Sequence, residues 1–493
     1  MQGVRIARAL AGIVSACLFT YTFLRAYRLP FVHDEGVTFL LFLLDGPSAL
    51  MDCYSANNHF LNTILMYCSA KLFGNGELAL RLPNVLFHAV FMFAVFLFVR
   101  PRFSNPVLLA CAFLILNMNP FMLDFFSLAR GYGISMALMM LGIFFFLRGM
   151  KNNARNQKDV LAAFWCAGLA AFANLSFLNF LAGILGAYLL ADALEISRQN
   201  VYSSFAVIVR QVVGGTRFFY KHIILMLLVL VPVGLNFYKE KTLYYGGQSG
   251  FWQDTIVSLI NSSGYDCSYL PMYVAVVKFL VVIVVVMLVV FLTLQLTGRL
   301  SHGSMDILLM SLIASITAAA VMVQNCIFGT PYPMDRTALH FLLYFGVICV
   351  LLAEYFMSSG RAIVRIAAVC LLVVLSSGSV GHALTNANLD HSLVWKYDAD
   401  VKQMLVDIDA DISQRGIKGK IAFGISWTFE PSINYYYAVK RPAWLPIVTR
   451  DGIKADYDYY YVRPDDKTEL LKKDVETIRV YPKTGNILAR KRI

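Results

Sequence analysis

Apolar residues occur in long runs over roughly the first three quarters of the chain and become sparse afterwards. Runs of roughly 20 such residues are long enough to cross a bilayer as helices, and they lack the two-residue alternation of a membrane β-barrel. A sliding-window reading gives about eleven spans. They are centred in residues 7–27, 82–99, 106–123, 131–148, 159–173, 175–192, 219–237, 272–296, 305–323, 338–356 and 362–380. The pattern predicts an all-α polytopic membrane protein.

Two segments between these runs differ from both spans and ordinary loops. Residues 59–73 are apolar but short, so we expect a re-entrant or interfacial helix there. Residues 238–271 are long, aromatic and contain glycine, which is typical of a mobile outer loop.

The chain changes character after residue 380, where charged residues become frequent and long apolar runs stop. The patterns predict helices over 395–412 and 432–440, strands over 420–426 and 456–464, and a terminal strand pair. We therefore divide the chain into a membrane domain, 1–380, and a small α/β domain, 381–493.

The formal net charge is +12, although only 15% of the residues are charged and 58% are hydrophobic. The basic residues gather in alternate loops, which indicates that those loops face the cytoplasm rather than that the chain binds nucleic acid. No small-residue cleavage site precedes Arg25, so we expect the first run to be retained. The chain is then a multi-pass protein of a plasma membrane, such as a bacterial inner membrane, with residues 33–35 and the C-terminal domain outside.

Two neighbouring acids follow the first predicted span. His33, Asp34 and Glu35 stand between apolar stretches, where a solvated loop start and a polar cleft are both open. A carboxylate in a half-dry cleft can act as a general base, and a neighbouring acid can orient it or bind a cation. Two adjacent acids favour the functional interpretation.

Three further clusters lie in predicted outer loops. The first contains Asn58, His59, Glu77 and Arg81, where capping by His59 and snorkelling of Arg81 are the structural alternatives. The second contains Asp124, Arg130 and Tyr132, in which Arg130 either binds phosphate or pairs with Asp124.

The third cluster contains Tyr332, Asp335 and Arg336, at the start of a predicted span. An arginine is poorly placed at a helix N-terminus, so Arg336 needs a further partner. The candidates are a phosphate, Asp335 or an acid of the first outer loop. Acids that activate a hydroxyl, arginines that hold a phosphate and a membrane that holds a lipid tail together indicate glycosyl transfer from a lipid-linked sugar phosphate.

Over most of residues 1–380 the chain resembles the GT-C membrane glycosyltransferases, in the family 39-like group of protein O-mannosyltransferases and lipid A aminoarabinose transferases. The motifs are the Asp34–Glu35 pair and the pattern F-G-x-x-E-x-x-x-R-L-P, which runs from Phe73 to Pro83. An A-R-x-Y turn follows at residues 129–132. Where the family has a basic residue followed by two prolines, this chain has Asn58-His59-Phe60.

The resemblance implies that Asp34 deprotonates the acceptor hydroxyl and that Glu35 supports it or contacts the sugar or a cation. It implies that Asn58, His59, Arg130 and Arg336 contact the donor phosphate. The donor would be a polyprenyl-phosphate sugar, and the acceptor a protein, a glycolipid or a polysaccharide. The reaction would be a single inverting displacement. A divalent cation is compatible with the acid pair, but the nine cysteines and eight histidines show no metal-ligand spacing.

The main alternative is a transporter or flippase for a lipid-linked saccharide. Such proteins place polar groups inside broken helices near the midplane, whereas the charges here lie at span ends. A phosphoethanolamine transferase needs a metal-bound soluble domain, and the C-terminal region offers only His382 and His391. A non-catalytic scaffold is disfavoured by the acids of the first loop.

Overall fold

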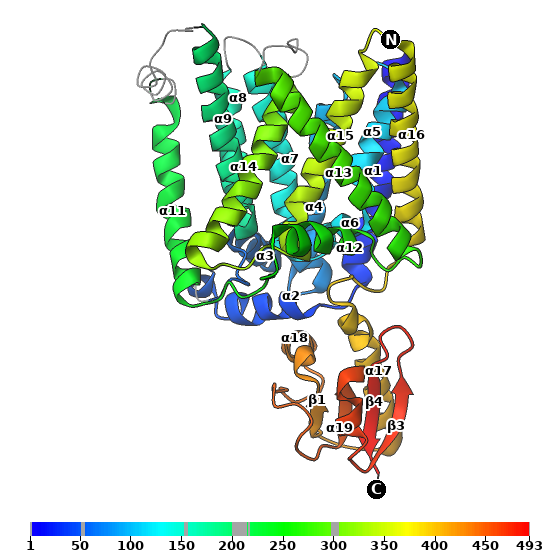
Figure 1. Ribbon diagram of the computed structural model, residues 1–493. Helices are drawn as coiled ribbons and strands as arrows, with labels where there is room; N and C mark the ends of the chain where they lie inside the picture. The colour runs from blue at the N-terminus through cyan, green and yellow to red at the C-terminus, as the bar shows by residue number, and fades with distance from the viewer. Residues whose placement is uncertain are drawn as a thin grey trace.

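The computed structural model describes residues 2–50, 55–151, 156–199, 214, 217–296 and 305–492. Its long helices lie side by side in one bundle, and a smaller α/β domain follows beyond one end of that bundle (Figure 1). The N-terminus is at the opposite end. The predicted fold class, a helical membrane protein with a small C-terminal α/β domain, is confirmed.

Within the described residues, nine helices are long and apolar enough to cross a membrane, or ten if a bent pair counts as one span. Including the pieces that border them, the bundle consists of α1 (Gln2–Arg28), α4 (Glu77–Val99), α5 (Pro106–Asn117), α6 (Pro120–Phe126), α7 (Gly131–Met150), α8 (Gln157–Ala173), α9 (Leu178–Gln199), α11 (Tyr220–Lys239), α13 (Leu270–Leu296), α14 (Met305–Phe328), α15 (Leu339–Met357) and α16 (Ala362–Thr385). Every predicted span falls on a helix, and 159–173 forms α8, which has only 17 residues.

The predicted span 106–123 is broken into α5 and α6, which meet at 69°. Pro120 cannot continue a preceding helix, and it disfavours helical geometry at Asn119. The side chain of Asn119 instead accepts the N–H of Met122 at 3.1 Å and caps a new helix. The bend carries α6 across the end of the bundle, toward the C-terminal domain (Figure 1).

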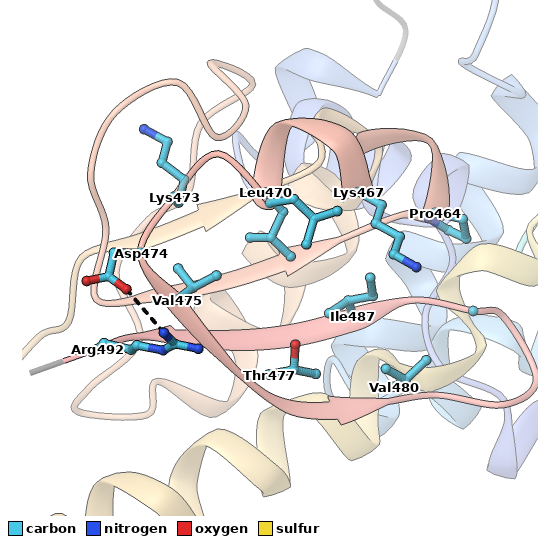
Figure 2. A pocket seen from close by; sticks show the side chains of 12 residues that line it. Pro464, Lys467, Leu470, Lys473, Asp474, Val475, Thr477, Val480, Ile487 and Arg492 are labelled. Atoms are coloured by element: carbon cyan, nitrogen blue, oxygen red, sulfur yellow. Dashed lines mark ion pairs between the residues drawn. The ribbon is translucent and has the colours of Figure 1, made fainter.

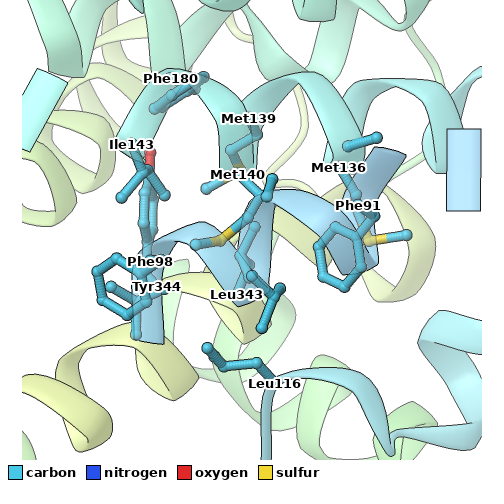
Figure 3. Close-up of a cluster of buried hydrophobic side chains, with 14 of the residues drawn as sticks. Phe91, Phe98, Leu116, Met136, Met139, Met140, Ile143, Phe180, Leu343 and Tyr344 are labelled. Atoms are coloured by element: carbon cyan, nitrogen blue, oxygen red, sulfur yellow. The ribbon is translucent and has the colours of Figure 1, made fainter. Parts of the chain in front are cut away.

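The bundle core is built around α7, where 78% of an 18-residue apolar stretch is buried. Its methionines face aromatic and aliphatic side chains of α4, α5, α9 and α15 (Figure 3). By contrast, only 6% of the corresponding stretch of α13 and 17% of that of α16 are buried. These apolar outer faces suit contact with lipid.

Short elements close the end of the bundle that faces the C-terminal domain (Figure 1). They are α2 (His33–Thr38), the π-helix η1 (Phe39–Leu43), η2 (Pro47–Ala49), α3 (Phe60–Phe73), η5 (Phe251–Val257), α12 (Ser258–Ser263) and η7 (Asp335–Ala338). The predicted short helix over 59–73 corresponds to α3. The segment 238–271 is not only a loop, because its second half forms η5 and α12.

The C-terminal domain is a four-stranded sheet with helices. It contains η8 (Lys396–Asp400), α17 (Val401–Arg415), β1 (Phe423–Ile425), η9 (Trp427–Phe429), α18 (Glu430–Lys440), β2 (Tyr459–Val462), η10 (Pro464–Asp466), α19 (Lys467–Leu470), β3 (Val475–Val480) and β4 (Ile487–Lys491). The strand order is β1-β2-β4-β3, with β1 parallel to β2 and the other pairs antiparallel. The predicted strands and helices of this region all form, within a few residues.

One hydrophobic cluster joins the membrane part of the chain to the core of the C-terminal domain. Phe31 and Phe39, from the membrane part, share it with Tyr435 and Val401 of the C-terminal part. The rings of Phe31 and Tyr435 stack with their centroids 3.8 Å apart. Helix α18 therefore packs directly on α2, the helix that carries the two adjacent acids.

Candidate active site

Asp34 lies on α2, at the junction of the bundle and the C-terminal domain. Its side chain is 16% exposed. One carboxylate oxygen, Oδ2, lies 3.5 Å from Nη2 of Arg130 and 3.6 Å from Nη2 of Arg336. The Trp395 side chain hydrogen-bonds to the same carboxyl group. Burial raises the pKa of Asp34, but the two arginines outweigh it, so the net pKa is lowered and the carboxylate is ionised.

Arg130 lies at the N-terminus of α7, where it hydrogen-bonds to α2 and to the segment before α3. Its Nη1 donates to the Thr38 hydroxyl at 3.0 Å and to the backbone carbonyls of Asp34 and Asn57 at 3.2 and 3.3 Å. Its Nε is buried and has no hydrogen-bond partner within the part of the chain that the structure describes. The predicted alternative, a structural pair with Asp124, is wrong, because the charged partner of Arg130 is Asp34.

His59 precedes α3, and its ring has a defined tautomer. Nδ1 receives the backbone N–H of Gly131 at 3.0 Å and the side-chain amide of Asn174 at 3.2 Å. The amide orientation of Asn174 is fixed because its oxygen accepts the N–H of Ser176. Burial and the nearby arginines lower the pKa of His59 well below its usual value. The neutral ring therefore carries its proton on Nε2.

That Nε2 proton points at a group that can only donate. Nη2 of Arg130 lies 2.9 Å from Nε2 of His59, and an arginine has no acceptor. Together with Nε of Arg130, the site presents two buried N–H donors that have no acceptor among the described residues. Unsatisfied buried donors cost free energy, and an anionic oxygen between these groups would satisfy them.

Arg336 approaches Asp34 from the other side, in η7 just before α15. Its guanidinium lies over the ring of Tyr245 at 4.0 Å and over that of Trp395 at 5.2 Å, and it hydrogen-bonds to Tyr132. Of the alternatives that the sequence left open, an acid of the first outer loop is the partner in this structure. The side chain of Asp335 does not pair with Arg336 but accepts the hydroxyls of Tyr245 and Ser262, at 3.0 and 2.8 Å.

Glu35 and Arg81 form an ion pair away from this opening, and both side chains are 0% exposed. Arg81 also donates to the carbonyls of Ala26, Leu29 and Pro30, at the end of α1. Arg81 therefore does not snorkel. Glu35 has no face open to a sugar or a cation, which contradicts a direct catalytic role for it.

Asp124 belongs to a separate buried network. Its carboxylate pairs with Arg25, accepts the hydroxyl of Tyr265 at 3.0 Å and accepts the N–H of Leu393 at 2.8 Å. Arg25 also donates to the carbonyl of His391 at 2.8 Å. This network ties the connector after α16 to the bundle.

Two other predicted site residues, Asn58 and Glu77, make structural contacts around the site. The amide of Asn58 donates to the Leu50 carbonyl at 3.1 Å, and its oxygen accepts the Thr63 hydroxyl at 2.8 Å, so Asn58 braces the start of α3. Glu77 accepts the hydroxyl of Tyr436 and the ammonium of Lys402, both at 3.0 Å, and so links the two domains.

Tyr332 and His33 also make structural contacts, Tyr332 through its backbone and His33 through its ring. The backbone of Tyr332 pairs with that of Gly247, which brings the segment carrying Tyr245 beside Arg336. Nδ1 of His33 lies 2.6 Å from the carbonyl oxygen of Thr428 in the C-terminal domain.

The motifs did not reveal Tyr245 or Trp395, which come from the long outer segment and from the start of the C-terminal domain. An aromatic residue in a loop carries no local signal of such a role. Among the described residues there is no group of three or more His, Cys, Asp or Glu side chains arranged to hold a metal ion. The two arginines beside Asp34 also make its carboxylate a poor cation ligand.

A cavity of about 560 Å³ lies elsewhere, on the C-terminal domain (Figure 2). Leu470, Val475, Val480 and Ile487 line it, and the ion pair Asp474–Arg492 crosses one side. It is formed by α19, β3 and β4, which lie on the side of this domain away from α2 (Figure 1). It therefore takes no part in the chemistry at Asp34.

The chain is similar to proteins of known family and structure. Residues 60–214 match the family model described as "Dolichyl-phosphate-mannose-protein mannosyltransferase". A search of curated protein sequences gave no match. The crystal structure of ArnT from Cupriavidus metallidurans bound to undecaprenyl phosphate is similar with a TM-score of 0.50 and 14% identity, over 98% of this chain and 97% of that chain. The apo ArnT structure gives 0.48 and 11%, over 97% of each chain.

The solved structure extends over both the helical bundle and the C-terminal domain, and the family model matches the stretch that contains Arg81, Arg130 and Tyr132 and begins one residue after His59. The resemblance to the GT-C membrane glycosyltransferases that the motifs indicated is thus confirmed, and the chain has their fold.

Proposed function

We propose that this protein is a glycosyltransferase that moves a sugar from a polyprenyl-phosphate donor to an acceptor hydroxyl on the outer face of the membrane. The observation that carries the proposal is the grouping of one ionised carboxylate, Asp34, with Arg130, Arg336 and the Nε2–H of His59. The arginines and His59 offer donors to a phosphate, and Asp34 offers an acceptor to a hydroxyl. The undecaprenyl phosphate bound in the ArnT crystal structure supports a donor of this chemical class.

In the proposed reaction the acceptor O–H transfers its proton to Asp34 while its oxygen attacks the anomeric carbon. The bond from that carbon to the phosphate oxygen breaks, and the polyprenyl phosphate leaves with the electron pair. A single displacement of this kind inverts the anomeric centre. Preorganised donors on the leaving phosphate, from Arg130 and Arg336, stabilise the charge that develops there.

The two arginines also weaken Asp34 as a base while the donor is absent, because they stabilise its ionised form. A bound phosphate supplies negative charge at the same arginines. It therefore offsets their effect on Asp34 and raises the affinity of the carboxylate for a proton. Asp34 becomes a stronger base once the donor is in place.

The location of the charges separates this proposal from a transporter or flippase. Helix α2, which carries Asp34, lies at the end of the bundle beside the C-terminal domain (Figure 1), and Arg130 and Arg336 lie within 3.6 Å of the Asp34 carboxylate. Transporters of the broken-helix type bind their substrates near the bilayer midplane. A flippase would also move the lipid-linked saccharide without cleaving it.

The test is release of polyprenyl phosphate by the purified protein from defined polyprenyl-phosphate sugars. Asp34→Asn is expected to lower turnover by about 10²–10⁴-fold, as for the loss of a general base. Asp45→Asn, at an exposed acid shortly after α2, serves as the control and should leave turnover unchanged. Normal transfer by Asp34→Asn would refute the assignment, and transfer of intact donor across vesicles without cleavage would favour the flippase.

A further inference from the structure

Asp398 is a carboxyl group of the C-terminal domain that is fully buried against α2. Its Oδ2 accepts the backbone N–H of His33, the residue before Asp34, at 2.7 Å. Its Oδ1 lies 3.0 Å from the hydroxyl oxygen of Ser432. This group belongs to none of the motifs, and the proposed reaction does not use it.

The hydrogen bonds around Asp398 fit a protonated carboxyl group. The hydroxyl oxygen of Ser432 also lies 3.1 Å from the carbonyl of Phe429, and it has only one proton to donate. If Oδ1 of Asp398 carries a proton and donates it to Ser432, then Ser432 donates to Phe429 and every group is satisfied. Burial raises the pKa of Asp398 well above its usual value, in agreement with this arrangement.

Helix α2 depends on such outside contacts, because a six-residue helix is not stable alone. Two N–H groups at or just before its start are bound by distant residues: that of Phe31 donates to the Tyr436 hydroxyl at 2.9 Å and that of His33 to Asp398. Gly36 faces Pro431 so closely that a Cβ there would lie 2.5 Å from the Pro431 carbonyl oxygen. The C-terminal domain thus determines how α2 is oriented.

We propose that Asp398 is a positioning residue for the base: by accepting the N–H of His33 it holds α2 so that the Asp34 carboxylate lies between Arg130 and Arg336. This inference rests on the proposed function. Its role needs a neutral acceptor of the right shape rather than a charge. Asparagine can replace it, with its oxygen toward His33 and its amide toward Ser432, whereas alanine cannot.

The test compares Asp398→Ala and Asp398→Asn in the full-length protein, with turnover and donor KM measured separately. Asp398→Ala is expected to lower kcat by about 10–100-fold, as for a misplacement of about 1 Å, with donor KM changing by less than about threefold. Asp398→Asn should retain kcat within about threefold. The control is Asp400→Ala, two residues along the same turn, where the side chain accepts the hydroxyl of Thr484 at 2.7 Å and not an N–H of α2.

Full kcat in Asp398→Ala would overturn the inference, and so would an Asp398→Asn variant as impaired as Asp398→Ala. Should Asp398→Ala fail to fold, Ser432→Ala decides instead. It removes the partner of the Asp398 proton and should lower kcat, counted per folded molecule, about three- to tenfold, and unchanged kcat would overturn the inference. If the unmodified protein releases no polyprenyl phosphate, the proposed function itself fails, which is a separate result.

Discussion

Replacing Glu35 by glutamine is expected to destabilise the fold rather than remove a catalytic group. The two oxygens of Glu35 accept four hydrogen bonds: from Nε of Arg81 at 2.8 Å, Nη2 of Arg81 at 2.5 Å, and the backbone N–H groups of Val32 at 3.0 Å and Ala129 at 2.5 Å. A glutamine side chain would turn an amide group toward two of these donors. It would also leave the guanidinium of Arg81 buried without a counter-charge.

The expected loss follows from that geometry. Removing one partner of a fully buried ion pair costs about 3–5 kcal/mol. The total stability of a folded domain is about 5–15 kcal/mol, so this is a large fraction of it. Because Arg81 also binds the carbonyl of Ala26 in α1 and those of Leu29 and Pro30 just after it, its displacement would loosen the junction between α1 and α2.

The assay is thermal unfolding of the detergent-solubilised variants, combined with turnover per folded molecule. Glu35→Gln should melt well below the unmodified protein, whereas Asp34→Asn, its neighbour, should melt normally and lose turnover. A Glu35→Gln variant that melts normally but does not turn over would refute this reasoning. It would show that Glu35 takes part in the chemical step.

Three other predictions concern the charged groups of the site. Arg130→Lys keeps the charge but loses the planar fork, so kcat/KM for the donor should fall by about 10²–10³-fold in steady-state kinetics, and an unchanged value would count against a phosphate contact. Burial raises the pKa of Asp34, but the arginines hold it below its usual value of about 3.9, so protonation of Asp34 should not lower kcat/KM between about pH 8 and 5. A decrease of kcat/KM with a midpoint near pH 6 that is absent in Asp34→Asn would contradict this. Because the pKa of Asp398 is raised in the folded state, folding takes up a proton above about pH 3.9, and this group lowers the stability of the fold as pH rises. Asp398→Asn should therefore melt above the unmodified protein at neutral pH, by a difference that shrinks toward pH 4, and a lower melting temperature at pH 7 would be evidence against a neutral Asp398.

The fold was largely accessible from the sequence, because its strongest determinant is local. A run of apolar residues long enough to cross a bilayer must form a helix, whatever it packs against. The break within 106–123 was missed, although Asn119-Pro120 carries the local signal for it. The count of spans also depended on α8, whose length is at the margin.

The site was accessible only in part. The acids and arginines stood out because charge is rare in this chain, and the poor fit of Arg336 to a helix N-terminus correctly indicated another partner. Which charges pair could not be read from spacing. Asp124 lies six residues from Arg130 but pairs with Arg25, and Glu35 pairs with Arg81 while its neighbour Asp34 faces two arginines. Such choices are made by tertiary packing.

The hydrophobic cluster that Phe31 and Phe39 share with Tyr435 and Val401 has a practical consequence for engineering. A chimera that joins this bundle to the C-terminal domain of a relative would leave apolar surface without a matching partner on both sides of this interface. It would also remove the C-terminal residues that lie beside Asp34. An exchange of the C-terminal domain between relatives therefore needs to carry the facing surfaces of α2 and α18 together.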